Sequence, residues 1–175
     1  MSRSDISAAP SETAPESASG LASGAVHNQA AEARRHALGV LARASAERVE
    51  ACMQVFGEAP PFVWLRRPET GTVMLRGRIA GDGAPFNLGE TSLTRCTLRT
   101  EDGAVGVGLV RGCSKRHAEL VALCDALLQG PESAGRVKDL VLRPLAEYEA
   151  EQQANRAAEV AASKVDFFTL VRGDA

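Results

Sequence analysis

The sequence predicts an α+β protein in which helices at both ends flank a four-stranded antiparallel sheet. Three observations lead to this prediction. Apolar residues recur at helical spacing on both sides of a central region that alternates as strands do. Turn residues separate the predicted strands, which favours an antiparallel meander. Too few helical stretches lie between the strands for the crossovers of a parallel sheet.

Residues 1–26 are rich in Ser, Ala, Glu, Gly and Pro. Such a segment buries too little apolar surface to offset the entropy of ordering it, so we expect a disordered tail. Residues 27–175 are expected to form a single α+β domain. It opens with helical periodicity from His27 to Gly57, where Ser45 is a suitable N-cap for a second helix.

The four strands are predicted where apolar and polar residues alternate: Phe62–Arg66, Thr72–Ala80, Thr91–Thr100 and Val105–Arg111. Their connections are rich in turn residues: Pro68–Gly71, the long glycine-rich loop Gly81–Gly89, and Asp102-Gly103. This glycine-rich loop lacks the Gly-Lys-Ser/Thr ending of a P-loop, so its glycines are expected to serve turn geometry or a close approach to another chain.

The C-terminal third is predicted to be helical. Ser114 begins a helix that packs on the sheet through a stripe of apolar residues and stops at Gly130-Pro131. The stripe consists of Leu120, Leu123, Cys124, Leu127 and Leu128. A short helical piece over Val137–Leu142 leads to Pro144, and a long alanine-rich helix then runs to about Lys164.

Composition excludes several classes of protein. The 20 basic and 22 acidic side chains give a net charge of −2, which argues against nucleic-acid binding. No run of about 18 apolar residues suits a membrane span, and we expect the first 26 residues not to be a secretory signal. The four cysteines form no CxxC pair, and the acidic residues form no spaced cluster, so we expect no metal site and a cytoplasmic location.

Positive charge concentrates in the predicted sheet, because residues 62–117 carry nine bases and five acids, whereas residues 145–175 carry three bases and six acids. Arg76 and Arg78 share one face of their strand, and so do Arg95 and Arg99. This basic sheet face is either a solvated surface or a surface that an anionic group or partner covers.

The segment Arg111–His117 is the strongest candidate for a chemical site. It joins a strand end to a helix N-terminus, where free N–H groups favour an anion. Four side chains are candidate anion ligands: Arg111, Lys115, Arg116 and His117. In the plainer interpretation Ser114 simply caps the helix, the bases point into water and His117 is a surface histidine. Cys113 is a poor candidate nucleophile, because no partner for it can be named.

The last residues, 165–175, are predicted to be a docking segment. Four large apolar side chains crowd into five positions near the terminus: Phe167, Phe168, Leu170 and Val171. Exposed, they would form an adhesive patch, so we expect them to be buried, preferably against a partner chain.

Three stretches together resemble one known family. They are Gly71–Arg95, Gly108–Gly112 with His117-Ala118-Glu119 and Asp125-Ala126-Leu127, and Ser163–Asp174, of which Asp166-Phe167-Phe168-Thr169 is the most specific. Over residues 30–175 the chain resembles the G subunit of the carbon–phosphorus lyase core complex, the PhnG family. Where the family commonly has an Arg-Asp pair, this chain has Cys113-Ser114.

The resemblance implies a part in phosphonate catabolism. It implies the H, I and J subunits of the core complex as partners, with an ATPase-like L subunit joining transiently. The implied reaction displaces adenine from MgATP by a phosphonate, which gives α-D-ribose 1-phosphonate 5-triphosphate. It also implies an iron–sulfur cluster and S-adenosylmethionine on a partner subunit only, with no cofactor in this chain.

The role of this chain stays open between two alternatives. It is expected to be an accessory, structural subunit of a transferase whose catalytic residues lie on a partner chain, and no catalytic residue is assigned here. The alternative is a direct contribution, in which the four anion candidates bind the phosphates of ATP or the phosphonate.

Overall fold

The computed structural model describes residues 19–79 and 82–163. The chain divides into two units, residues 1–33 and 34–175. Helix α1 (Ser19–Arg43) crosses from the first unit into the second at Arg34. It begins inside the stretch expected to be disordered, while residues 1–18 lie outside the described residues, so the disordered tail stays a prediction.

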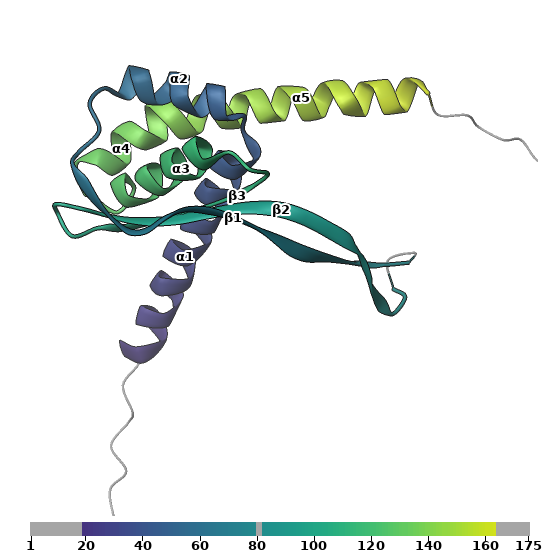
Figure 1. Cartoon of the computed structure of the whole chain (residues 1–175), viewed down its shortest axis with the longest axis horizontal. Coiled ribbons are helices and arrows are strands. Elements are labelled where there is room, and N and C mark those ends of the chain that lie inside the picture. The colour runs from purple at the N-terminus through teal and green to yellow at the C-terminus, as the bar shows by residue number, and fades with distance from the viewer. Residues whose placement is uncertain (1–18, 80–81, 164–175) are drawn as a thin grey trace, which may run out of the picture. The chain divides into compact units, whose positions relative to one another are not determined.

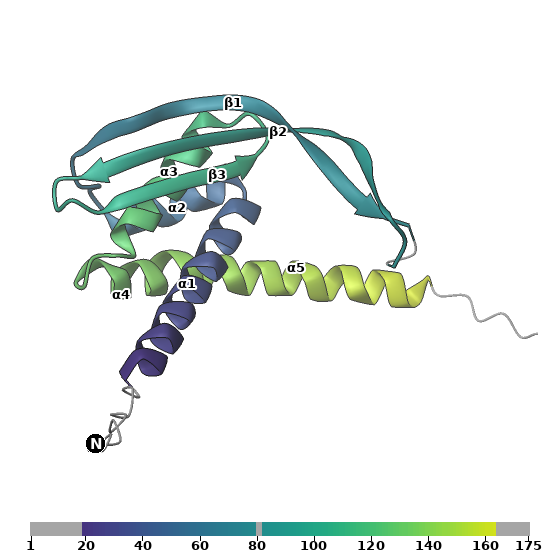
Figure 2. The same cartoon turned by 90° about the horizontal axis from the view of Figure 1, so that it is seen from below.

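The second unit is an α+β fold, with one sheet between helical segments. After α1 come α2 (Ala46–Phe56), β1 (Phe62–Arg78), β2 (Pro85–Thr100), β3 (Val105–Arg111), α3 (Lys115–Leu127), α4 (Ser133–Val137), the π-helical turn η1 (Lys138–Leu142) and α5 (Arg143–Ala162). Helices α2, α3 and α5 all lie on one side of the sheet (Figures 1 and 2). The N-terminal helices, the helix packed on the sheet and the long C-terminal helix are therefore confirmed.

The sheet has three strands, where the sequence predicted four. The order is β1-β2-β3, and both pairs are antiparallel. The two strands expected at Phe62–Arg66 and Thr72–Ala80 are one continuous strand, β1, and the turn expected at Pro68–Gly71 is absent. The prediction of a four-stranded meander is wrong in this respect.

Two irregularities in register explain how a proline can lie inside β1. The pairing with β2 shifts between Trp64 and Arg66 and again between Arg66 and Glu69, so Pro68 lies in a bulge. β1 is also an edge strand. Because proline cannot donate a ladder hydrogen bond, edge strands and bulges are the places where a sheet tolerates it. The Pro-Glu-Thr-Gly sequence therefore interrupts the ladder without turning the chain.

The glycine-rich loop is also shorter than predicted, because β2 begins at Pro85 and includes residues expected to be loop. Leu75 pairs with Gly89 and Arg78 with Pro85, with one more register shift between them. β1 and β2 consequently form a ribbon that continues past the end of β3, as Figure 1 shows. We call residues 72–79 and 85–92 the ribbon.

The core lies between α3 and the sheet. Leu98 and Val110 are fully or almost fully buried beneath α3. At Gly106 and Gly108 a Cβ atom would come within 1.9 Å of the carbonyl oxygens of Ala122 and Ala118. The backbone of α3 therefore lies directly on β3, and only glycine leaves room for this approach.

Helix ends follow the predicted capping. The Ser45 hydroxyl accepts a hydrogen bond from the Arg48 N–H at 3.4 Å, and the Ser114 hydroxyl accepts one from the His117 N–H at 3.2 Å. The predicted apolar stripe of α3 is buried, except that Leu128 is only half-buried. α5 has its proline in the first turn, as predicted.

Candidate functional site

The turn from β3 into α3 is rigidly built. Gly112 has a φ of +98°, a conformation that favours glycine, and its N–H donates to the Ser92 carbonyl at 2.9 Å. Its own carbonyl accepts from the Thr94 hydroxyl at 2.7 Å. Together with the Ser114 cap, these bonds fix the backbone of the turn that carries the four candidate anion ligands.

His117 is buried, so the expectation of a surface histidine is wrong. Its Nε2 lies 2.9 Å from the Leu41 carbonyl oxygen in the last turn of α1. Carbonyls of a last helical turn have no partner within their helix. A proton on Nε2 satisfies one of them, so the ring fastens α1 to α3 and faces away from the solvent side of the turn.

Arg116 is held by two carboxylates. Its Nε lies 3.1 Å from Glu50 Oε1 and its guanidinium 2.6 Å from Glu119 Oε1. These residues line a hollow of about 220 Å³ between α2 and α3. Arg116 is itself exposed, but its guanidinium group already has two carboxylate partners within the chain, with which an external anion would have to compete.

Arg111 and Lys115 are exposed, and neither forms an ion pair within the described part of the chain. The structure therefore separates the four predicted anion ligands: Arg111, Lys115 and Arg116 remain on the surface, Arg116 is paired there with two carboxylates, and His117 turns inward. Cys113 is an exposed free thiol in the same turn.

The basic sheet face divides into two parts. Arg95 pairs in register with Leu109 and Arg99 with Val105, on the face opposite α3. Beyond the register shift at Leu75/Arg76, Arg76 and Arg78 belong to the ribbon, and alternation along β1 places them on the reverse side from Leu75 and Gly77. The four arginines do not form one surface.

Arg95 shares a carboxylate with Arg66. Their guanidinium groups lie 2.7 Å and 2.8 Å from Glu69 Oε1. The hydrogen bond from Arg95, followed by the positive charges of both arginines, lowers the pKa of Glu69 below its ordinary value. Arg99 forms no ion pair among residues 19–79 and 82–163.

The most elaborate polar cluster was not found from the sequence. Asp125, fully buried on α3, accepts hydrogen bonds from Arg34 Nε at 2.8 Å and Arg34 Nη2 at 2.7 Å. It also accepts one from the Val107 N–H at 2.9 Å, and Gln129 donates to the Val105 carbonyl at 2.8 Å. These bonds satisfy two backbone groups of β3. The sequence held one sign of this cluster: Asp125 lies within the apolar stripe of α3, and an aspartate is rarely buried unless it is paired.

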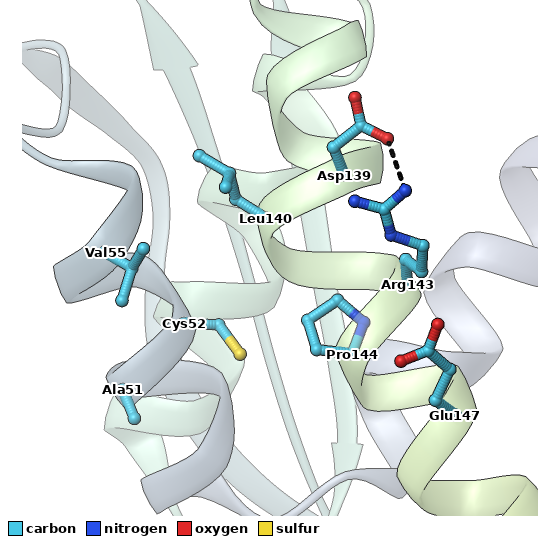
Figure 3. Close-up of a pocket in the computed structure, with 8 residues that line it drawn as sticks. All are labelled: Ala51, Cys52, Val55, Asp139, Leu140, Arg143, Pro144 and Glu147. Atoms are coloured by element: carbon cyan, nitrogen blue, oxygen red, sulfur yellow. Dashed lines mark ion pairs between the residues drawn. The ribbon is translucent and has the colours of Figure 1, made fainter.

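A shallow groove of about 410 Å³ lies between α2 and the η1–α5 segment (Figure 3). Its apolar walls come from Val55 and Cys52 on one side and Leu140 and Pro144 on the other, with an Asp139–Arg143 ion pair of 3.5 Å at its rim. Partial burial raises the pKa of the Cys52 thiol. Reactive chemistry needs a thiolate, so this environment does not favour a nucleophile.

Two further cysteines face the core. Burial raises the pKa of Cys96 to about 11 and that of Cys124 to about 12. The described residues contain no group of three His, Cys, Asp or Glu side chains placed to hold a metal ion. Within the same residues, no helix has the length and apolar character needed to span a membrane. The predicted docking residues Phe167, Phe168, Leu170 and Val171 lie outside the described residues, so their role stays a prediction.

Comparison with known proteins identifies the class to which this fold belongs. Residues 32–173 match the family described as "Phosphonate metabolism protein PhnG". The chain is 41% identical over 141 residues to the "Alpha-D-ribose 1-methylphosphonate 5-triphosphate synthase subunit PhnG" of Rhizobium meliloti (strain 1021). That match covers 81% of this chain and 90% of the relative. The chain belongs to the PhnG family.

Proposed function

We propose that this chain is the G subunit of an α-D-ribose 1-methylphosphonate 5-triphosphate synthase and that it is an accessory, structural subunit. In the proposed reaction, which takes place in the cytoplasm, a phosphonate displaces adenine from the ribose of MgATP. The catalytic groups lie on partner subunits, for which the H, I and L subunits are the candidates. The J subunit, with its iron–sulfur cluster and S-adenosylmethionine, acts on the product.

The separation of the four candidate anion ligands carries the accessory role. A triphosphate site needs several cations directed at one point. Here His117 contacts the Leu41 carbonyl and Arg116 is paired with Glu50 and Glu119. Arg111 and Lys115 lie at the surface without a carboxylate partner among the described residues.

The test is release of adenine from ATP in the presence of methylphosphonate. We expect none from the isolated chain, and release only when this chain is combined with the H, I and L subunits. Omitting this chain should remove the activity together with the assembled complex. Release of adenine by the isolated chain at the rate of the complex would overturn the accessory role.

A direct contribution to phosphate binding is the second candidate. Lys115 is exposed in the first turn of α3, and Arg111 is exposed at the end of β3 that leads into it. The positive charge of Lys115 is unfavourable near the positive end of the helix dipole, and a bound anion would relieve this repulsion. The discriminating variant is Lys115→Glu in the assembled complex, with Lys138→Glu on η1 as the matched control. Under the accessory role both complexes release adenine at the unaltered rate. A loss specific to Lys115→Glu, with the complex intact, would establish the second candidate instead.

A further inference from the structure

β3 directs its larger side chains away from the body of the protein. The positions facing α3 are Gly106, Gly108 and Val110, whereas Val105, Val107 and Leu109 lie on the opposite face and are 36%, 40% and 50% exposed. A sheet with one solvated face usually alternates apolar inward and polar outward. A strand that is apolar on both faces is typical of a sheet covered on both sides. Here α3 packs on one face, and α2 and α5 lie on that same side (Figure 2).

The ribbon adds a second uncovered apolar surface. The last pair between β2 and β3 is Leu93 with Arg111, so no third strand accompanies the ribbon among the described residues. Large apolar side chains remain exposed along it: Val73, Met74, Leu75, Phe86 and Leu88. A two-stranded ribbon is marginally stable in water unless its apolar side chains pack against something.

Register joins the two surfaces into one. Gly71 pairs with Leu93, and Leu93 pairs with Arg111, on the face opposite α3. Alternation along β1 then places Val73 and Leu75 on the same face. Past the register shift, Phe86 pairs with Gly77, and both Phe86 and Leu88 lie within 4.0 Å of the place where a Gly77 Cβ would be. We call this continuous surface, from Val105 and Leu109 to Phe86, the open face.

The charge of the open face indicates what kind of surface binds there. It carries Arg66, Arg95, Arg99 and Arg111 but only one acid, Glu69, which is shared between Arg66 and Arg95. A second copy docked through the same face would bring these arginines together, because a two-fold interface places identical patches in contact. A surface of apolar side chains flanked by carboxylates would neutralise them.

We propose that the open face is a docking surface for another subunit of the synthase, and that the subunit contributes an apolar surface bordered by Asp and Glu. This inference rests on the proposed function. The ribbon gains its packing from that partner, and Arg99 and Arg111 gain carboxylates that the described residues 19–79 and 82–163 do not supply. The occupant is thereby defined by its chemistry, as an acidic and apolar protein surface.

The experiment compares co-purification of the chain with the co-expressed synthase subunits. The test variant is Val107→Glu/Leu109→Glu, and the matched control is Val160→Glu, an apolar-to-acidic change on α5 at a position 69% exposed. We expect the test variant to weaken association about tenfold or more, because the new carboxylates lie in the centre of the interface, while the control associates as the unaltered chain does. Circular dichroism of the isolated variants checks that both are folded.

Two further measurements define the chemistry of the occupant. Arg99→Glu should also weaken association, and tighter association would overturn the acidic partner. Amide hydrogen exchange across the ribbon should be fast in the isolated chain and slower in the complex. Unchanged exchange would overturn docking of the ribbon.

The outcomes separate this inference from the proposed function. If the unaltered chain joins the synthase subunits and Val107→Glu/Leu109→Glu joins equally well, the docking surface is wrong and the proposed function stands. If the unaltered chain joins none of them, the proposed function is wrong. If the isolated chain sediments as a dimer that the double variant dissociates, the occupant is a second copy, which contradicts the acidic partner.

Discussion

The two faces of β3 differ in side-chain size. On the face beneath α3, glycines at 106 and 108 let the helix backbone approach until a Cβ would clash. On the open face, Val107 and Leu109 occupy the intervening positions and are 40% and 50% exposed. Both faces of β3 are apolar, so the comparison teaches that the buried face of this strand is distinguished by closeness of packing.

The carboxylates on the two sides of the sheet, Asp125 on α3 and Glu69 on β1, differ in burial and in their partners. Asp125 is completely buried and accepts three hydrogen bonds, two from Arg34 and one from the β3 backbone. Glu69 is exposed and shared between two arginines. The buried carboxylate fastens α1, α3 and β3 together, whereas the exposed one leaves a net positive surface on the open face.

The largest effect is expected from filling the glycine contacts. Gly106→Ala or Gly108→Ala places a methyl group against the carbonyl of Ala122 or Ala118, so each should lower the free energy of unfolding by about 3 kcal/mol. Chemical denaturation measures the change. Gly71→Ala is the matched control, because nothing lies within 4 Å of its Cβ position, and it should change stability by about 0.5 kcal/mol or less. Equal effects at all three positions would contradict close packing as the distinguishing feature.

Leucines on the two faces provide the next test. Leu98→Ala should cost about 3 kcal/mol, because it opens a cavity in the completely buried side of the sheet. Leu109→Ala in the isolated chain should cost less than about 1 kcal/mol, since half of that side chain is exposed. Thermal or urea unfolding of the two variants measures the difference. A cost at Leu109 equal to that at Leu98 would show that the open face is covered within this chain.

The buried carboxylate is expected to contribute more than the exposed one. Asp125→Asn removes the charge that holds Arg34 and weakens the bond to the Val107 N–H, so it should lower the free energy of unfolding by about 2 kcal/mol. Glu69→Gln should change the free energy of unfolding by less than Asp125→Asn does, because solvent screens an exposed ion pair. Urea unfolding of both variants decides the comparison, and a larger loss at Glu69 would contradict it.

The smallest effect concerns pH. Because Arg95, through its hydrogen bond, and Arg66 lower the pKa of folded Glu69, the stabilisation from this carboxylate is complete above the ordinary glutamate pKa and is lost as pH falls through the lowered one. Arg95→Met should raise the pKa of Glu69 toward its ordinary value, and NMR titration of the Glu69 carboxyl carbon measures it. An unchanged titration would show that Arg95 does not hold this carboxylate in solution.

Much of the fold could be predicted because local signals were strong. Ser45 and Ser114 cap helices where the sequence placed them, since a serine before an apolar periodic run can satisfy free N–H groups. The turn predicted at Pro68 was wrong. Pro-Glu-Thr-Gly is typical of a turn, but an edge strand can hold the same residues in a bulge. Whether a strand has a neighbour on one side or on both is not a local property.

The candidate site depended still more on tertiary contacts. The segment from Arg111 to His117 reads as a cluster of cations, and spacing alone gives no sign that Glu50, 66 positions earlier, pairs with Arg116. The Leu41 carbonyl that receives His117 is 76 positions away. The role of Asp125 likewise depends on Arg34 and β3, which are distant in sequence and surround it only in the folded chain.

The sequence by itself determined the α+β class, the helix caps, the charge of the central region and membership of the PhnG family, because these follow from local spacing and from residue identity. Only the tertiary structure decided the number of strands, the separation of the four anion candidates and the side of the sheet that stays uncovered. The physical reason is that alternation along β3 is apolar on both faces. The buried face of β3 is therefore the one that carries Gly106 and Gly108, because only there can the backbone of α3 pack directly on the strand.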